Sequence, residues 1–198
     1  MISFVTEDDP PPDDVELMLR ARDGDLVAFE QVVRIHQHAV FGTAAKMLGS
    51  ESDAEDIAQM VFVRAWKSAH RYVPTAKVST WLMTITRNLV FNECRRRKTA
   101  RLTPLEAAED HHHIRIADPS QRPADQLAHE AELVAAVDAA IAALPEKARM
   151  AVILRRYEEK SYEEIADILD LSLPAVKSLL FRAREELKER LTAYLKNP

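Results

Sequence analysis

The segment from Ser161 to Arg184 reads SYEEIADILDLSLPAVKSLLFRAR, and its pattern predicts two short helices joined by a tight turn. Ser161 and Glu164 have the spacing of a capping box, in which each side chain satisfies a backbone amide at the start of a helix. The apolar residues that this first helix would bury are Tyr162, Ile165, Ala166 and Leu169. After the turn, Ser172 would cap a second helix that tolerates Pro174 in its first turn.

The second helix is amphipathic on a helical wheel. Its apolar stripe comprises Val176, Leu180, Ala183, Leu187 and Leu191, and its opposite side carries Pro174, Lys177, Ser178, Phe181, Arg182 and Glu185. Such a pair of helices predicts a helix-turn-helix, whose second helix lies in the major groove of DNA. There Lys177 and Arg182 could contact guanine acceptors or phosphates, and Phe181 could contact a thymine methyl group. An ordinary helical hairpin with a solvated charged face is the alternative.

The whole chain has the composition of an all-α protein. It has 198 residues, 47% of them hydrophobic, and only three glycines, and its apolar residues recur at helical spacing almost throughout. We predict two small helical domains joined by a flexible linker that is rich in proline and histidine. The predicted parts are a disordered acidic N-terminus (1–13), an N-terminal domain (14–98), the linker (99–126) and a C-terminal domain (127–198).

Charge and cysteine content limit the possible functions. A net charge of −5 argues against a generally basic coat for nucleic acid, although local cationic patches remain compatible with it. The single cysteine, Cys94, cannot form an internal disulfide, which fits a reducing compartment. The sequence has no leader-like N-terminus and no stretch of membrane-spanning length, so we expect a cytoplasmic protein without membrane insertion.

The N-terminal domain contains a second predicted capping box, from Ser52 to Glu55. The far face of the helix that it opens presents Asp56, Gln59, Met60, Val63 and Lys67. Two exposed apolar residues among charges indicate a partner surface, although scattered surface residues of this kind are also ordinary.

The next predicted helix begins near Thr80. Its inward residues would be Trp81, Leu82, Ile85 and Leu89, and its outward residues Met83, Thr84, Arg87, Phe91 and Arg95. It runs into the basic cluster Arg95–Lys98. Basic charge interleaved with exposed aromatic rings is typical of a surface that follows phosphates and stacks on unpaired bases. The alternative is a solvated helix end that stabilises its own dipole.

Together these segments resemble the sigma-70 superfamily, and in particular its short two-domain extracytoplasmic-function (ECF) group. The resemblance covers nearly everything from Leu17 to Leu191 except the linker. The segments that carry it are Asp53–Trp66, Thr80–Leu82, Arg87-Asn88, Leu144-Pro-Glu146, Ser161–Ala166, Val176–Ser178 and Phe181–Arg184.

The resemblance implies a transcription initiation factor that binds core RNA polymerase and promoter DNA. One helix would dock on the clamp of the largest polymerase subunit through Asp53, Asp56, Gln59, Met60 and Val63. The −10 element would be read and trapped, once melted, by the loop at 74–79 and the helix after it, through Lys77, Ser79, Thr80, Trp81, Arg87, Asn88, Phe91, Arg95, Arg96 and Arg97. The −35 element would be read through Pro174, Lys177, Ser178, Phe181, Arg182 and Arg184. An anti-sigma partner is implied as well.

The sequence departs from the family pattern at three places. Met60 stands where an acidic residue is usual, so this docking contact would be more apolar. Leu179 stands where arginine is frequent, and Pro174-Ala175 replaces a common Gly-Thr. The last two departures affect the expected promoter preference and leave the expected mode of binding unchanged.

We expect no enzymatic activity, cofactor or metal. No nucleotide-binding glycine loop or nucleophile constellation is present in the sequence. A metal site would have to rest on His111–His113, but three consecutive imidazoles do not converge easily on one ion. The other competing hypothesis, a stand-alone helix-turn-helix regulator, leaves the basic helix and the Met60 face without a purpose.

Overall fold

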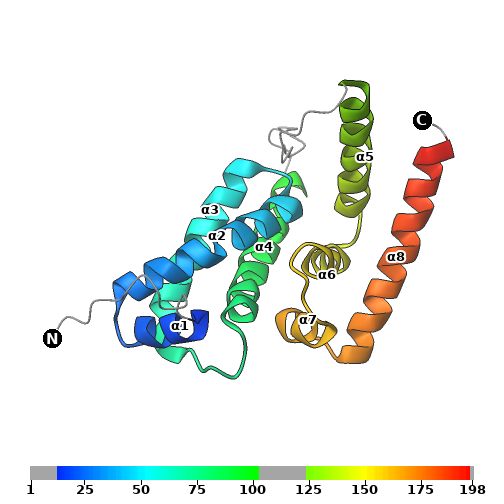
Figure 1. Cartoon of the computed structure of the whole chain (residues 1–198). Helices are drawn as coiled ribbons and strands as arrows, with labels where there is room; N and C mark the ends of the chain where they lie inside the picture. The colour runs from blue at the N-terminus through cyan, green and yellow to red at the C-terminus, as the bar shows by residue number, and fades with distance from the viewer. Residues whose placement is uncertain (1–12, 103–123, 197–198) are drawn as a thin grey trace.

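A computed structural model of the chain describes residues 13–102 and 124–196, and every regular element within these ranges is helical (Figure 1). This confirms the all-α prediction. The elements in order are α1 (Asp14–Arg22), α2 (Leu26–Leu48), α3 (Glu51–Ser68), the 3₁₀ turn η1 (Ala69–Arg71), α4 (Val78–Leu102), α5 (Ala124–Ala142), α6 (Glu146–Arg156), α7 (Tyr162–Leu169) and α8 (Leu173–Lys196).

The N-terminal domain is a bundle of α1 to α4, packed around α2 (Figure 1). Its largest fully buried side chains are Leu17, Met18, Val32, Val40, Met47 and Leu82. The rings of Phe29 and Trp66 pack at 5.1 Å between centroids and join α2 to α3. This core holds α3 and α4 side by side.

The start of α3 differs from the prediction. Ser50, in extended backbone, is the N-cap, and its hydroxyl accepts a hydrogen bond from the Asp53 amide at 3.3 Å. Gly49 ends α2 in the left-handed region, at φ +67°, so the chain re-enters a helix directly after Ser50. The predicted capping box at Ser52 was therefore wrong, because Ser52 already lies inside the first turn of α3.

The C-terminal half confirms the predicted helix-turn-helix. Ser161 and Glu164 form a capping box: the Ser161 hydroxyl accepts from the Glu164 amide at 3.1 Å, and the Glu164 carboxylate accepts from the Ser161 amide at 2.7 Å. Asp170 ends α7 in the left-handed region at φ +53°. The Ser172 hydroxyl accepts from the Ala175 amide at 3.4 Å, at the start of α8. The chain therefore turns sharply between α7 and α8.

The two halves share one continuous apolar cluster, in which α7 and α6 pack against α4 and α2 (Figure 1). Helix α4 continues to Leu102, beyond the predicted domain end at 98, and α5 begins at Ala124, before the predicted start at 127. The histidines His111–His113 and the N-terminal residues 1–12 lie outside the described residues.

Candidate nucleic-acid interface

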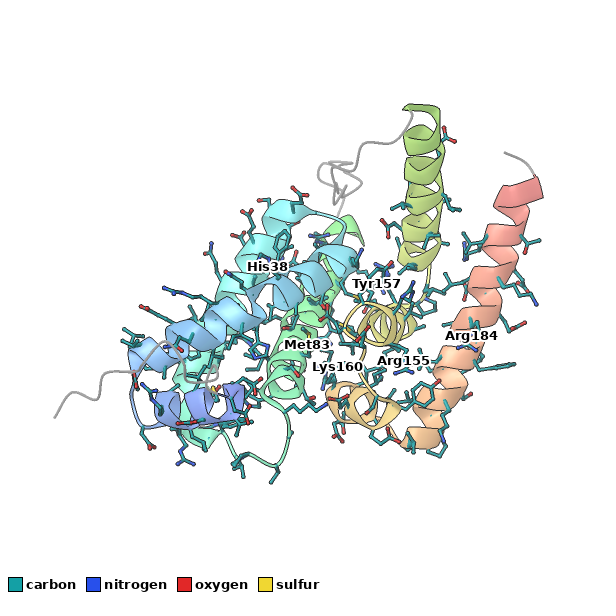
Figure 2. All side chains as sticks on the ribbon, viewed as in Figure 1. His38, Met83, Arg155, Tyr157, Lys160 and Arg184 are labelled. Atoms are coloured by element: carbon teal, nitrogen blue, oxygen red, sulfur yellow. The ribbon has the colours of Figure 1, made fainter. Side chains whose placement is uncertain are left out.

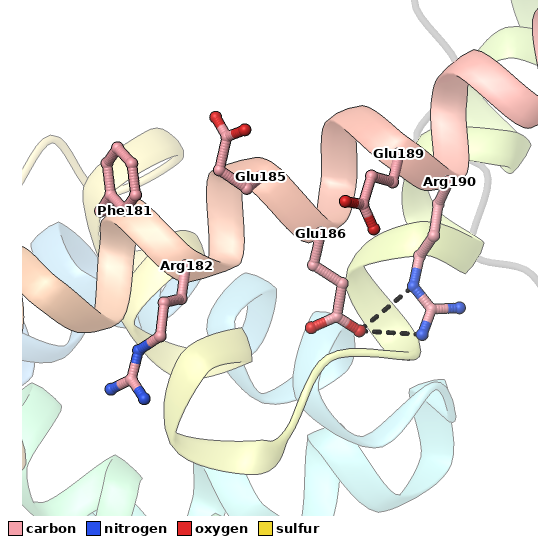
Figure 3. Close-up of a pocket in the computed structure, with 6 residues that line it drawn as sticks. All are labelled: Phe181, Arg182, Glu185, Glu186, Glu189 and Arg190. Atoms are coloured by element: carbon pink, nitrogen blue, oxygen red, sulfur yellow. Dashed lines mark hydrogen bonds and ion pairs between the residues drawn. The ribbon is translucent and has the colours of Figure 1, made fainter.

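The outer face of α8 is exposed as the sequence predicts. Val176 and Ala183 are buried beneath it, and Phe181 is 65% exposed. The other predicted contact residues, all exposed, are Pro174, Lys177, Ser178, Arg182 and Arg184. Phe181 and Glu185 project to the same side of α8 in Figure 3, beside a shallow depression. An ion pair of 2.8 Å between Glu186 and Arg190 lies at the far end of this depression.

The outer face of α3 carries a mixed polar and apolar patch. Met60 is 43% exposed and Val63 is 53% exposed, and both Asp56 and Gln59 are exposed beside them. Asp53 differs from these residues because it is half-buried and forms an ion pair with Arg97. This pair ties the start of α3 to α4.

The basic cluster on α4 is largely engaged with carboxylates. Arg96 pairs with Glu93 at 2.8 Å, and Lys98 pairs with Glu146 of α6 at 2.6 Å. The hydrogen bonds from Arg96 and Arg97 hold the pKa of Glu93 below its ordinary value, against the effect of burial. Arg97 also donates to the Leu48 carbonyl at 2.9 Å, so its guanidinium serves the packing of α2, α3 and α4.

The start of α4 is covered by the C-terminal domain. Lys77 pairs with Glu164 at 3.2 Å, and the hydroxyl of buried Thr80 donates to the same carboxylate at 3.4 Å. About two turns further along α4, Arg87 Nε donates to the Ile168 carbonyl at 2.9 Å. Of the other predicted −10 residues, Asn88 and Arg95 are exposed, whereas Ser79, Trp81 and Phe91 are half-buried.

Met83 is 2% exposed, so its predicted outward position was wrong. Met83 and Arg87 are one turn apart and share a face of α4, and α7 packs on this helix. The apolar cluster that contains Met83 also contains Ile165 and Ile168 of α7. Packing between the two domains therefore removes Met83 from solvent.

Lys160 is an interface residue that the sequence pattern does not identify. It precedes the capping box and is 8% exposed, and its ammonium group donates to the Ser79 hydroxyl at 2.5 Å (Figure 2). Burial lowers the pKa of Lys160, and the carboxylates of Glu164 and Glu158 oppose that shift. Burial acts to raise the pKa of Glu164, but the Ser161 amide, Lys77 and Lys160 together hold it below its ordinary value.

Cys94 and Arg149 interact electrostatically across the seam between the two domains, where α6 and α7 pack on α2 and α4. Burial raises the pKa of the half-buried Cys94 thiol, and Glu146 raises it further. Arg149 of α6 donates to the Met47 carbonyl at the end of α2 at 3.0 Å. It also donates to the carbonyl groups of Ala142, the last residue of α5, and of Leu144 just after this helix.

Within the described ranges, no group of histidine, cysteine, aspartate and glutamate side chains could hold a metal ion. Likewise, none of the described helices is long and apolar enough to cross a membrane.

Two family models match the chain in order. The model of sigma-70 region 2 matches residues 32–100, which include α3 and most of α4, and the model of sigma-70 region 4 matches residues 135–187, which include the helix-turn-helix.

Two relatives with this kind of match along the chain are RNA polymerase sigma factors. The chain is 34% identical to the ECF RNA polymerase sigma factor SigE of Mycolicibacterium smegmatis over 84% of its own length and 63% of that protein. It is 31% identical to the ECF RNA polymerase sigma factor SigW of Bacillus subtilis over 89% of its own length and 98% of that protein.

Among solved structures, CnrH in complex with the cytosolic domain of CnrY matches with a TM-score of 0.67 and 27% identity, over 91% of this chain and 97% of that one. RpoE of Bartonella quintana, solved in complex with the anti-sigma factor NepR, matches with a TM-score of 0.64 and 23% identity, over 83% of this chain and 96% of that one.

Proposed function

Because the chain belongs to the ECF group of the sigma-70 family, we propose that it binds core RNA polymerase, directs initiation of transcription at particular promoters and helps to open them. The observation that carries this proposal is the order of the two matched regions along a chain that exposes one mixed face on α3 and one cationic, aromatic face on α8.

Core polymerase docks, in this proposal, on the α3 face. Asp56, Gln59, Met60 and Val63 are the docking residues, and the two apolar side chains provide area that would lose water on binding. Asp53 is occupied by Arg97 and contributes by fixing the start of α3.

The experiment is a pull-down of core polymerase with the Met60→Lys variant. A charge on this face should reduce binding at least about tenfold, because an apolar contact in a partner interface would become a buried charge. Leu133→Lys is the matched control, since Leu133 on α5 has the same 43% exposure as Met60. Equal retention of core polymerase by both variants would contradict the docking assignment.

Promoter DNA binds at the two remaining surfaces. The −35 element meets α8 through its exposed residues: Pro174, Lys177, Ser178, Phe181, Arg182 and Arg184. The melted −10 element meets α4 and the loop before it, through Lys77, Ser79, Thr80, Trp81, Arg87, Asn88, Phe91, Arg95 and Arg96. We assign Arg97 to the fold, because its guanidinium bridges three helices.

We further propose that the protein acts in the cytoplasm, where polymerase and promoter meet, and has no catalytic activity of its own. The likeness to CnrH, solved with the cytosolic domain of CnrY, and to RpoE, solved with the anti-sigma factor NepR, supports a protein partner of the anti-sigma kind for this chain as well.

A further inference from the structure

Only one of the three proposed binding surfaces is covered by the other domain. The α3 face and the outer face of α8 are exposed, whereas α7 lies against α4 (Figure 1). The covered side includes several side chains proposed above to hold the melted −10 strand. The contacts across this seam therefore bear on how that strand gains access.

The contacts pair phosphate-binding groups with oxygen acceptors. The ammonium of Lys77 and the hydroxyl of Thr80 meet Oε1 of Glu164 at 3.2 Å and 3.4 Å. The guanidinium of Arg87 meets the carbonyl oxygen of Ile168 at 2.9 Å. Ammonium, hydroxyl and guanidinium groups are also the usual donors to phosphate and sugar oxygens of nucleic acids.

We propose that α7 is an intramolecular competitor of promoter DNA: in the free chain, the Glu164 carboxylate and the Ile168 carbonyl occupy donors of α4, and of Lys77 directly before it, that the −10 strand must engage. This inference rests on the proposed −10 surface. The closed chain still presents its polymerase-docking and −35 faces, and separation of α7 from α4 releases the −10 face.

Glu164 serves two purposes that one substitution can separate. Its Oε2 accepts from the Ser161 amide at 2.7 Å and completes the capping box of α7, whereas its Oε1 faces Lys77 and Thr80. A glutamine also completes a capping box. Glu164→Gln therefore keeps the helix start and removes the charge that faces α4.

Lys160 of the C-terminal domain also stabilises the contact between the two domains. Its buried ammonium donates to Ser79, directly before Thr80. A buried charge costs desolvation energy that its partners only partly return, so this contact closes the domains without making the closed state very stable. Further polar contacts along the seam join Thr43 to Glu158 at 3.2 Å and Lys98 to Glu146 at 2.6 Å.

The test measures the affinity of the full-length protein for a fluorescent single-stranded DNA of about a dozen nucleotides with randomised sequence, by anisotropy at fixed salt. Glu164→Gln should tighten binding about three- to five-fold, the effect of one partly exposed ion pair. Lys160→Met should also tighten binding, even though it removes a cation. Glu163→Gln is the matched control, because Glu163 is the exposed neighbour on the same helix and loses the same charge.

Equal tightening of DNA binding by Glu163→Gln and Glu164→Gln would overturn the proposal, because the loss of one negative charge from the protein would then explain the gain in affinity. Unchanged affinity of the Glu164→Gln variant, with its helicity intact by circular dichroism, would overturn it too. Adding Arg95→Ala to the Glu164→Gln variant distinguishes a failure of this inference from a failure of the proposed −10 surface, since Arg95 is exposed on α4. Loss of the gained affinity places the DNA on α4, whereas unchanged affinity rejects the −10 surface itself.

Discussion

Arg182 is an exposed arginine on the outer face of α8, among the residues proposed to read the −35 element. Within the part of the chain that the structure describes, its guanidinium forms one long hydrogen bond of 3.4 Å, to the Ser178 carbonyl of its own helix. The guanidinium is thus free to form a bidentate contact with a guanine in the major groove.

Arg182→Ala should cost about 1–3 kcal/mol at one position of the −35 element and relax the preference there. The measurement is transcription in vitro with core polymerase on promoters that vary at single −35 positions. Lys188→Ala removes one exposed charge from the same helix and should lower activity evenly across those promoters. An unaltered −35 preference in the Arg182 variant would mean that α8 lies in the groove in another register.

His36 is a second residue whose environment predicts a measurable property. Its ring is 8% exposed and contacts the Asp14 carboxylate at 3.0 Å, which joins α2 to α1. Burial lowers the pKa of His36, the Asp14 carboxylate opposes this shift, and Lys160 adds to it. The folded protein therefore binds this proton less readily than the unfolded chain does.

The free energy of unfolding should fall as pH drops below the unperturbed histidine value of 6.5, because the unfolded chain then takes up the proton first. His36→Gln should remove that part of the decline. Urea unfolding at about pH 7.5 and about pH 5.5 measures the difference. His38→Gln is the control, since His38 is exposed on the same helix (Figure 2). A pH dependence that is identical in wild type and His36→Gln would contradict this assignment.

At the scale of single helices, the capping residues decide where each element begins. Ser50 caps α3 and Ser161 caps α7, whereas Ser52 lies exposed within the first turn of α3. Ser50→Ala and Ser161→Ala should each lower the free energy of unfolding by about 1 kcal/mol. Ser52→Ala should change it by no more than about half that amount. Urea titration measures all three, and a larger loss from Ser52→Ala would restore the original capping prediction.

Helices could be predicted from the sequence because their signals are local. The stripe under α8 and the capping box of α7 depend on residues at most four positions apart, and the structure confirms both. The start of α3 was misplaced by two residues, because Ser52 precedes Glu55 by the interval of a capping box. The left-handed Gly49 ends α2 directly before Ser50, so that Ser50 is the residue that caps α3.

At the scale of the whole molecule, the spacing of apolar residues no longer predicts which side chains are buried, because contacts between domains leave no local pattern in the sequence. The wheel of α4 places Met83 beside Arg87, but only the position of α7 explains why Met83 is buried. The pairs Asp53–Arg97 and Lys160–Ser79 join residues that are far apart in the chain. The sequence predicts the types of surface, and the tertiary structure decides which of their side chains are already engaged.

The half-buried Cys94 thiol at the contact between the domains gives the protein an internal probe of domain separation. Cys94 is the only cysteine, and only its thiolate form reacts with iodoacetamide. Burial and a raised pKa should make alkylation of the closed chain at least about tenfold slower than that of the urea-unfolded chain. Core polymerase should accelerate the reaction if docking parts the domains, and mass spectrometry follows the rate without any added label. Equal rates in the native and the unfolded chain would mean that solvent already reaches the seam.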